Sequence, residues 1–514
     1  MVHIVKNLSL VSVCTLLSRI FGFVRDVTVA VCVGASWQYD AFVVALRIPN
    51  FGRRLFAEGA FTQAFVPVLC TYEGKPKPAY MRFINAVFGL LSLVVLLIVL
   101  LGQYFSGACV AVLAPGLSLT PERLTLASQL LVITFPFLLF VVITAFAAAI
   151  LNARQHFLAP ASAPIVLNVT MIGFVSFAYF TGLSTVHALA WGLVAGGILQ
   201  LLLQFLPLSR IGVIPKPALD MQEPGVRRVL TLMGPAILGG SVWQINTIID
   251  GMFASFLPSG SISWLYYAER LFEFPIGIIG VALSTVLLPL MSAKSHQKLD
   301  AEFSRTVDWG IRWTLLLGVP AAVSLFLLAE PIFITLFQHG AFTAQDSLKS
   351  AWALQAFALS LPAHFAIRVL LSAHYSRQNF RFPLKVAICC LVVSVMGNFA
   401  LVGPYGHVGL ALASSLGAWL NVGLLFWSVV HAKAWVFEPG WLRYFVQIII
   451  ATLGLTLVVW ALKGEVAVWH VQGVIARALS LAGIVGVGVL VYLALLFCLG
   501  LRPKTMLANP SGVA

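Results

Sequence analysis

The sequence predicts an all-α polytopic membrane protein with fourteen transmembrane helices, and three observations support this fold class. The 514 residues are 60% hydrophobic and only 9% charged, whereas about a quarter of the residues in a soluble domain are charged. Apolar runs of about 20 residues, each long enough to cross a bilayer, recur along the whole chain. These runs are continuous rather than alternating. That favours helices over a closed barrel, whose strands alternate between lipid-facing and lumen-facing residues.

Each span is placed where a long apolar run is bounded by charged or turn-forming residues. The first run resembles a signal peptide for a few residues, but it lacks a small-residue cleavage site, so we interpret it as an uncleaved helix. We expect helices at residues 8–31, 39–71, 81–107, 123–151, 158–182, 187–207, 226–256, 261–293, 304–329, 346–375, 382–403, 406–431, 440–462 and 473–500.

The basic residues of the loops indicate the orientation of the chain. The loops after odd-numbered spans hold only Arg123, Lys349 and Lys463. The loops after even-numbered spans, with the span ends that border them, and the two chain ends hold nineteen basic residues, namely Lys6, Lys75, Lys77, Arg82, Arg154, Arg210, Lys216, Arg227, Arg228, Lys294, Lys298, Arg305, Arg377, Arg381, Lys385, Lys433, Arg443, Arg502 and Lys504. By the positive-inside rule, both termini are then cytoplasmic. The net charge of +14 is explained by topology, and we expect no nucleic acid partner.

Two halves of the chain repeat one another. The segment RQHFLAP at 154–160 matches RQNFRFP at 377–383, and two further pairs of segments match at nearly the same offset. Spans 1–6 and 7–12 are therefore predicted to form two pseudo-symmetric six-helix lobes, related as a parallel repeat. Such lobes usually face each other across a central cavity. The predicted division is 1–215 for the first lobe, 216–435 for the second, and 436–514 for two additional helices.

Charged residues also occur inside the predicted spans, where the bilayer disfavours them. A central Arg costs an inserted helix about 2.5–3.5 kcal/mol by insertion scales. Spans 1, 2 and 8 nevertheless hold three charged segments: SRIFGFVRD at 18–26, YDAFVVALRIPNFGRRLFAEGAF at 39–61 and YYAERLFEFP at 266–275.

Two interpretations of these charges compete. One is a set of buried ion pairs that joins the two lobes, and Arg270 with Glu273, three residues apart, can pair along one helix. The other is a cationic pocket for an anionic substrate, since a guanidinium group matches phosphate oxygens bidentately. We favour the pocket, because the arginines of the cluster outnumber the acids deep in the spans; they are Arg19, Arg25, Arg53, Arg54 and Arg270.

Motifs of catalysis are missing from the sequence. It contains no GxxxxGK[ST], GxSxG or HExxH segment, and the seven cysteines show no metal-binding spacing. We therefore expect a transporter rather than an enzyme, with no metal and no cofactor. Without an ATP site, the driving force is expected to be a coupled monovalent ion, the membrane potential or consumption of the product.

The charged segments closely resemble the MurJ/MviN family of lipid II flippases, which belongs to the superfamily of multidrug/oligosaccharidyl-lipid/polysaccharide exporters. The resemblance covers essentially the whole chain, and its most specific part is AEGAFTQAFVP at 57–67. It implies two lobes in a V shape, with the last two helices forming a groove for a lipid tail. It also implies the substrate lipid II, an undecaprenyl-pyrophosphate-linked disaccharide pentapeptide. The implied setting is peptidoglycan biosynthesis and cell shape at a bacterial inner membrane.

The resemblance further assigns roles to residues. The substrate-binding residues would be Ser18, Arg19, Arg25, Arg53 and Arg270, with the arginines meeting the pyrophosphate. The gating or ion-coupling residues would be Asp26, Asp40, Glu58 and Glu273. None of the family's residues is replaced at these positions. The expected partners are lipid II and membrane lipids, and the sequence leaves open whether the peptidoglycan synthesis machinery docks on the protein.

Three alternatives remain at this point. A multidrug antiporter of the same superfamily would bind cationic drugs and should have a cavity dominated by acids. A flippase for another polyprenyl-linked oligosaccharide would present the same pyrophosphate site. A membrane scaffold without transport activity would gain nothing from charges this expensive to insert.

Overall fold

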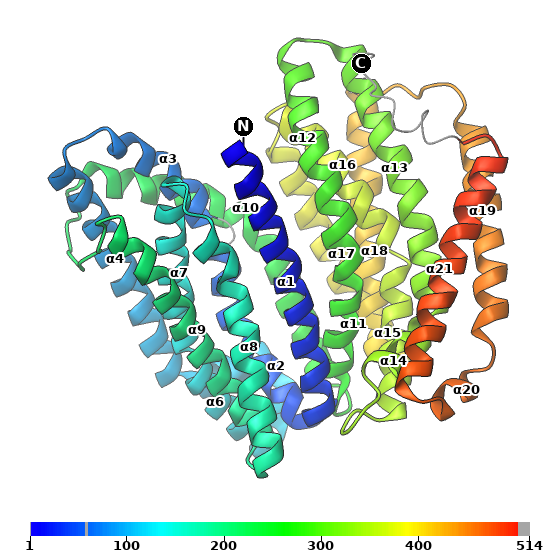
Figure 1. The fold of residues 1–514 in the computed structure, drawn as a ribbon, viewed down its shortest axis with the longest axis horizontal. Helices are drawn as coiled ribbons and strands as arrows, with labels where there is room; N and C mark the ends of the chain where they lie inside the picture. Colours follow the sequence, from blue (N-terminus) through cyan, green and yellow to red (C-terminus); the bar gives the residue numbers. More distant parts are fainter. Residues whose placement is uncertain (1, 57–59, 502–514) are drawn as a thin grey trace. The chain divides into compact units, whose positions relative to one another are not determined.

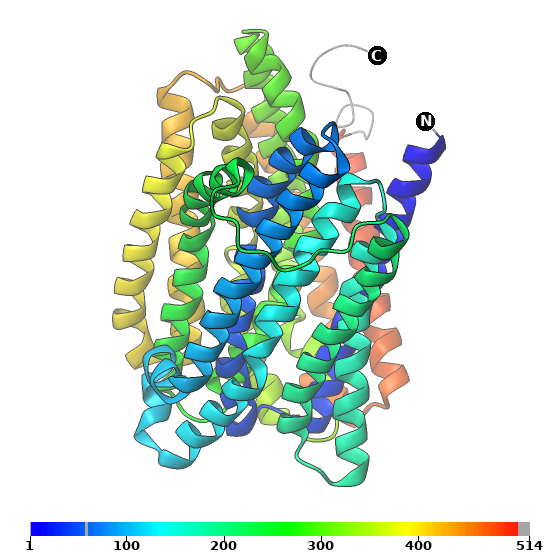
Figure 2. The same cartoon turned by 90° about the vertical axis from the view of Figure 1, so that its left-hand side faces the viewer.

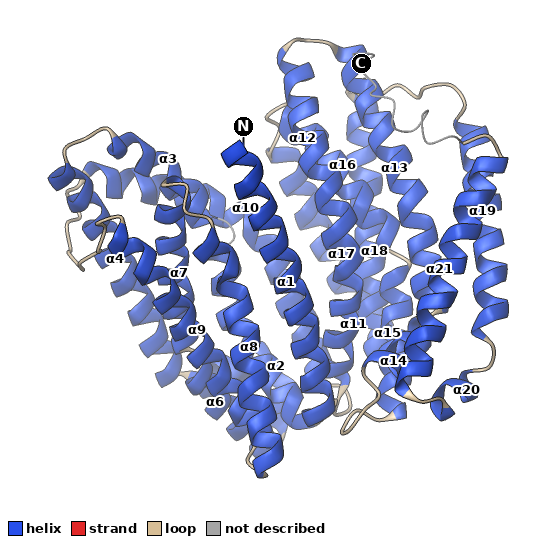
Figure 3. Ribbon diagram, in the orientation of Figure 1, coloured by secondary structure: helices blue, strands red, loops and turns tan. Residues whose placement is uncertain are grey.

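The computed structural model describes the backbone of residues 2–56 and 60–501, and their side chains except at 2–9, 55, 56, 60 and 235–243. Within this part of the chain the regular secondary structure is helical, and no strand occurs (Figure 3). The predicted all-α fold class is therefore confirmed.

The chain packs into two compact units, which follow one another along the colour ramp of Figure 1. The first comprises residues 1–263 and 340–342, and the second comprises 264–339 and 343–514. The first unit contains α1 (Val2–Val33), α2 (Trp37–Phe56), α3 (Ala60–Glu73), α4 (Lys77–Tyr104), α5 (Ser106–Leu113), η1 (Pro115–Leu119), α6 (Pro121–Thr134), α7 (Pro136–Ala153), α8 (Leu158–Thr181), α9 (Thr185–Arg210) and α10 (Pro224–Ser255).

The second unit begins within the first turn of α11 (Ser261–Pro275). It continues with η2 (Ile276–Gly280), α12 (Val281–His296), α13 (Asp300–Leu327), α14 (Ala329–Leu336), α15 (Ala344–Ala358), α16 (Leu361–Ser376), α17 (Arg381–Tyr405), α18 (His407–His431), α19 (Trp441–Lys463), α20 (Val466–Val471) and α21 (Val474–Cys498). The division of the chain at residues 215 and 435 stays a prediction.

Many of these helices can cross a membrane. In the described residues, ten segments are long and apolar enough, or eleven if the bent pair of α15 and α16 forms one span. The three predicted spans outside this set are α1, α2 with α3, and α10. Each of them includes residues whose side chains the structure does not describe. The membrane-spanning architecture is thus confirmed, while the number fourteen stays a prediction.

Prolines explain why some predicted spans are broken helices. The predicted span 123–151 consists of α6 and α7, which meet at Phe135. Pro136 has no N–H and so cannot bond to the carbonyl of Val132, four residues earlier. The Nε2 atom of Gln103 on α4 donates to this carbonyl at 2.9 Å. The predicted span 261–293 is also divided, because α11 ends at Pro275 and the π-helical turn η2 separates it from α12.

The repeated RQxFxxP motif forms the same turn in each unit. Gln155 and Gln378 both adopt the left-handed conformation, with φ values of 62° and 58°. The preceding arginines make matching contacts. Arg154 pairs with Glu73 at 3.6 Å and lies over the ring of Tyr80. In the second unit, Arg377 likewise pairs with Asp300 at 3.0 Å and lies over the ring of Phe303. The sequence repeat is therefore also a structural repeat at this turn.

Helices α19 and α21 pack against α13 around a buried apolar cluster that includes Leu316, Ile448 and Leu455. Two buried tyrosines on these helices bond to carbonyls of α13. Tyr492 donates to the carbonyl of Leu316 at 2.8 Å, and Tyr444 donates to that of Arg312 at 2.6 Å. The two C-terminal helices are thus part of the core of the second unit.

Both ends of this helical pair are held by buried charges. At one end Asp308 of α13 accepts hydrogen bonds from Trp435 Nε1 at 3.1 Å, Trp441 Nε1 at 2.7 Å and Arg312 Nε at 2.7 Å. At the other end Arg477 donates to the carbonyl of His470 at 2.8 Å, near the C-terminus of α20. A cation at a helix C-terminus is favourable because the helix dipole is negative there.

In Figure 2 the segment between α9 and α10 runs as a loop along one end of the first unit. Its backbone is tied to α4, since the N–H of Ala218 donates to the carbonyl of Asn85 and that of Lys216 donates to Asn85 Oδ1. Arg82 of α4 pairs with Asp220 of the loop at 2.7 Å. This loop is therefore a fixed strap rather than a free linker.

Candidate functional site

The structure distributes the predicted site residues over three helices in two units. Helix α1 carries Ser18, Arg19, Arg25 and Asp26, and α2 carries Asp40 and Arg53; all belong to the first unit. Arg270 and Glu273 lie on α11 in the second unit. Glu58 lies outside the described residues.

Arg25 is bound within the first unit. Its Nη2 atom lies 2.7 Å from Asp26 Oδ1, and its Nε atom donates to the same oxygen at 3.1 Å. Its Nη1 atom donates to Asn168 Oδ1 on α8 at 2.9 Å. The exposed fractions of the Arg25 and Asp26 side chains are 18% and 8%. Arg25 and Asp26 therefore form a largely buried ion pair within α1, which does not join the two units.

Asn168 joins two of the predicted residues. Besides accepting from Arg25, its Nδ2 atom donates to the carbonyl of Ser18 at 3.3 Å. Ser18, Gly22 and Arg25 fall on one face of α1, at the i, i+4 and i+7 spacing. A Cβ atom at Gly22 would lie only 3.4 Å from Asn168 Nδ2, so this face of α1 packs closely against α8. This role of Asn168 could not be predicted from the sequence, since an Asn in an apolar helix carries no signal of its partner.

The other two predicted arginines of this unit are half-buried. Arg19 lies on α1, and Arg53 lies in the last turn of α2. Half-burial of a guanidinium group in a membrane protein implies a polar environment, since the charge is too expensive to leave in hydrocarbon.

Asp40 is a buried carboxylate that holds the start of α11. It is 6% exposed. One oxygen accepts from the N–H of Gly260 at 2.6 Å, and the other accepts from the N–H and the hydroxyl of Ser263 at 2.8 and 2.5 Å. These donors include a free N–H of the first helical turn, so Asp40 caps α11 from a distant part of the chain. Ser263 is a partner of Asp40 that could not be predicted from the sequence.

A glycine makes room for one further arginine of α2. A Cβ atom at Gly251 on α10 would overlap the guanidinium group of Arg47, so the lack of a side chain at this position lets Arg47 reach α10. One turn earlier on α10, Asn246 Nδ2 donates to Asp250 Oδ2 at 2.9 Å.

In the second unit, the predicted pair of Arg270 and Glu273 forms as expected. Arg270 Nη1 lies 3.1 Å from Glu273 Oε2, and the guanidinium group lies 4.7 Å from the ring centroid of Tyr266. Tyr266, Arg270 and Glu273 thus form one stripe along α11. The exposed fractions of Arg270 and Glu273 are 31% and 37%, so this pair is far more accessible than that of Arg25 and Asp26.

The chemistry available to these groups is binding. Guanidinium groups can hold an oxyanion by charge-assisted hydrogen bonds. Among the described residues, no group of three or more His, Cys, Asp or Glu side chains could hold a metal ion. The seven cysteines are all free thiols.

Comparisons with known proteins agree with the resemblance in the charged segments. A family model described as "Lipid II flippase MurJ" matches residues 29–492. The chain is 39% identical to a probable lipid II flippase MurJ of Vibrio cholerae over 515 residues, which cover 98% of both chains. It is 37% identical to that of Buchnera aphidicola subsp. Acyrthosiphon pisum over 501 residues, which cover 97% of this chain and 98% of the relative.

Solved structures show the same relationship. A structure titled "Lipid II flippase MurJ, inward closed conformation" matches with a TM-score of 0.80 and 29% identity, over 95% of this chain and 97% of the other. An inward-facing transporter of the multidrug MATE family matches with a TM-score of 0.65 and 13% identity, over 81% of this chain and 95% of the other. At that identity the second match shows only a shared fold.

Proposed function

Because the chain belongs to the MurJ family of lipid II flippases, we propose that it flips lipid II from the cytoplasmic to the periplasmic leaflet by alternating access. Membership of this family makes the protein a multi-pass membrane transporter, and not an enzyme. Its place is the inner membrane of a bacterium, in peptidoglycan biosynthesis. The mechanism, the binding residues and the orientation with both termini in the cytoplasm are our proposals.

The observation that carries the proposal is the set of arginines on α1, α2 and α11, all partly accessible within helices of a membrane protein. Several such cations can be tolerated only around a wet cavity or in ion pairs. Arg270, with 31% of its side chain exposed, is the best candidate to meet the pyrophosphate directly. Arg25 is already bound to Asp26 and Asn168. It would bind the substrate only by sharing or exchanging these contacts.

The ion pairs of Arg25 and Arg270 have a proposed role in the transport cycle. A pyrophosphate that approaches Arg25 would compete with Asp26 for the guanidinium group, so substrate binding and the ion pair would be coupled. The same holds for Arg270 and Glu273. Asp26 and Glu273 are therefore proposed as gating residues that occupy the arginines while substrate is absent. Asp40 caps α11 and would act on the site through the position of that helix.

A flipping assay tests the proposal. Lipid II with a fluorescent headgroup would be reconstituted in vesicles with the protein, and its transfer between leaflets would be followed. We expect Arg270→Ala to reduce the rate at least tenfold, because a hydrogen bond to a charged group contributes about 1.5–3 kcal/mol. Arg270→Lys should retain part of the rate. The control is Arg228→Ala, which removes an exposed Arg from α10. Full flipping by both Arg270→Ala and Arg25→Ala would refute the cationic site.

Two further experiments test the substrate specificity and the driving force. Polyprenyl phosphates with other sugars, offered as competitors, should displace lipid II poorly; efficient displacement would instead favour a flippase for another polyprenyl-linked oligosaccharide. Driving force is tested by imposing and collapsing a membrane potential, since moving one charge through 100 mV is worth about 2.3 kcal/mol. A rate insensitive to potential and to monovalent ions would leave product consumption as the driving force.

A further inference from the structure

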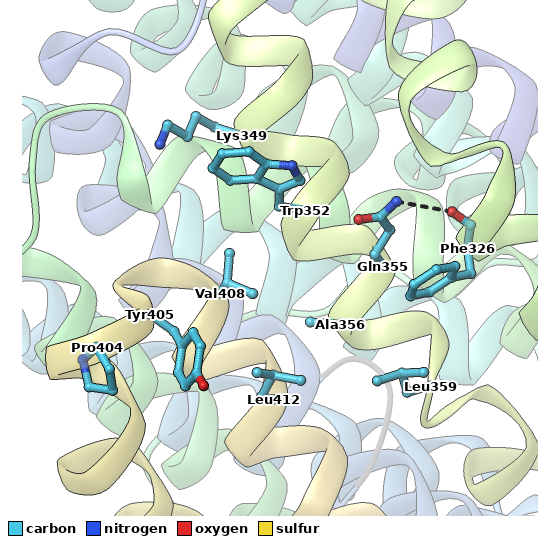
Figure 4. A pocket seen from close by; sticks show the side chains of 10 residues that line it. All are labelled: Phe326, Lys349, Trp352, Gln355, Ala356, Leu359, Pro404, Tyr405, Val408 and Leu412. Carbon is cyan, nitrogen blue, oxygen red and sulfur yellow. Dashed lines mark hydrogen bonds between the residues drawn. The ribbon is translucent and has the colours of Figure 1, made fainter. Parts of the chain in front are cut away.

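The second unit contains a cavity that shares no residue with the proposed substrate site. Its volume is about 540 Å³, within the range of pockets that bind small molecules. Its walls come from the end of α13, from α15, and from the turn between α17 and α18 (Figure 4). None of its ten lining residues is acidic.

One end of the cavity is cationic. Lys349 places its Nζ atom 4.5 Å from the ring centroid of Trp352, and Figure 4 shows the two side chains together at this end. The nearest acid along α15 is Asp346, whose oxygens accept from Trp264 Nε1 at 2.8 Å and from the Thr343 hydroxyl at 2.7 Å. In the part of the chain that the structure describes, no carboxylate forms an ion pair with Lys349. Its charge is thus available to an external anion.

The rest of the cavity is apolar and aromatic. Leu359 and Leu412 lie at the end opposite Lys349, and Phe326 and Tyr405 form the sides (Figure 4). Gln355 turns its amide nitrogen to the carbonyl of Phe326 at 3.2 Å. Leu359, Tyr405 and Trp352 are all exposed despite their size, so the cavity is open along this wall.

The predicted span 346–375, which contains most of α15, puts these two ends at different depths in a membrane. The predicted span begins at residue 346, so Lys349 lies near the surface, and Leu359 lies ten residues further along. At 1.5 Å per residue, that is about 15 Å deeper. Trp, Tyr and Lys are typical of the membrane–water interface. The cavity therefore presents a cation at headgroup level and an apolar wall at the level of the acyl chains.

We propose that this cavity binds an anionic glycerophospholipid. The phosphodiester group would meet Lys349, and an acyl chain would lie along Leu359 and Leu412. In the orientation proposed above, the lipid comes from the periplasmic leaflet. The sequence repeat does not itself require this arrangement, because at an offset of 222 residues Lys349 and Trp352 correspond to Ala127 and Leu130, both fully buried in the first unit.

Native mass spectrometry of the full-length protein tests this proposal. The protein would be titrated with phosphatidylglycerol and with phosphatidylcholine of the same acyl chains. We expect the wild type to prefer phosphatidylglycerol, and Lys349→Gln to lose about fivefold in affinity for it, the effect of one lysine near an anionic surface. Lys463→Gln removes the charge of a lysine on the same side of the second unit and should leave the preference intact. Lys349→Arg should keep it.

The outcomes separate this pocket from a general surface effect. If Lys349→Gln keeps the full preference, or if Lys463→Gln reduces it equally, the proposal is wrong. Displacement of the bound lipid by glycerol phosphate alone would show a site for free phosphate, and would also overturn the lipid assignment. Trp352→Ala should weaken binding of both lipids, since it removes part of the wall they share. The assay needs no flipping, so its result is independent of the proposed transport activity.

Discussion

Proline residues inside helices or at a break between two helices leave single carbonyls without their helical donor, and side chains from other helices replace it. Pro320 in α13 has no N–H for the carbonyl of Leu316, and the buried Tyr492 hydroxyl bonds there instead. The same arrangement occurs twice in the first unit. The further sets of proline, carbonyl and donor are Pro136, Val132 and Gln103 at 2.9 Å, and Pro49, Ala45 and Thr134 at 3.3 Å. A buried polar group without a partner costs about 1–3 kcal/mol. Each of these hydrogen bonds therefore stabilises the contact between the helix of the proline and the helix of the donor.

Two tyrosines of the C-terminal helices provide a matched test. Tyr492→Phe should lower the free energy of unfolding by about 1–3 kcal/mol, because it orphans the carbonyl of Leu316. Tyr444→Phe should cost only about 0.5–1.5 kcal/mol, because the carbonyl of Arg312 can still accept the helical N–H of Leu316. Both phenols are about equally buried, with exposed fractions of 5% and 4%. Thermal unfolding in detergent measures the difference.

The proline itself supplies the control. In a Pro320→Ala background, residue 320 regains an N–H that can serve Leu316, so Tyr492→Phe should become as mild as Tyr444→Phe. If the cost of Tyr492→Phe is the same in both backgrounds, the orphaned carbonyl is not its cause.

At the scale of elements, the strap between α9 and α10 shows how a loop is fixed on a helical bundle. The Arg82 guanidinium group, hydrogen-bonded to Asp220, holds the pKa of this carboxyl below its ordinary value of 3.8. Further along the strap, the hydroxyl of Tyr72 donates to Glu223 at 2.7 Å. The strap also covers Gly89, where a Cβ atom would overlap the backbone of Ala218. Charge and close backbone packing therefore act together on this loop.

The lowered pKa of Asp220 predicts a pH dependence with a definite sign. A carboxyl whose folded pKa lies below its unfolded pKa stabilises the fold above the unfolded value, and this contribution is lost as the pH falls through the folded value. We expect Asp220→Asn to be slightly less stable than the wild type at pH 7. The effect should be small, because the pair is exposed to solvent. Below about pH 4 the two should converge in melting temperature. Glu122→Gln, an exposed acid on α6, is the control. A gap that persists at low pH would contradict the ion-pair explanation.

For the whole molecule, the sequence predicts the helices better than it predicts the site. The expected span 406–431 is nearly α18, His407–His431, and the expected span 158–182 is nearly α8, Leu158–Thr181, since apolar length marks a span. Breaks such as that at Phe135 depend on whether a neighbour satisfies the freed carbonyl. The roles of Asn168 and Ser263 likewise depend on which helices meet, and hydropathy contains no information about that. Family motifs located the charged residues, but only the structure revealed their partners.

Whether the remaining predicted spans, α1, α2 with α3, and α10, cross the membrane can be judged from the sides on which the later loops lie. If exactly one of them did not cross the membrane, every later loop would change sides. The basic loops at Lys294 to Arg305 and at Arg377 to Lys385 would then lie outside, against the positive-inside rule. The asymmetry of the loop charges therefore supports crossing by all three, and it makes a prediction for each loop.

We expect impermeant thiol reagents to distinguish the two sets of loops in a background without the native cysteines. Ser184→Cys and Val471→Cys, both at exposed positions after odd-numbered spans, should react in intact spheroplasts. Gly74→Cys and Gln297→Cys, exposed after even-numbered spans, should react only after permeabilisation. Gly74 tolerates the change because a Cβ atom there meets nothing within 4 Å.

The two cytoplasmic sites test different spans. The side on which Gly74→Cys lies depends on whether α1 and α2 with α3 cross the membrane, and the side on which Gln297→Cys lies depends on α10 as well. Reaction at Gln297→Cys but not at Gly74→Cys in intact spheroplasts would show that one span between them, α10 foremost, does not cross. Reaction at both sites in intact spheroplasts would show that either α1 or α2 with α3 does not cross the membrane.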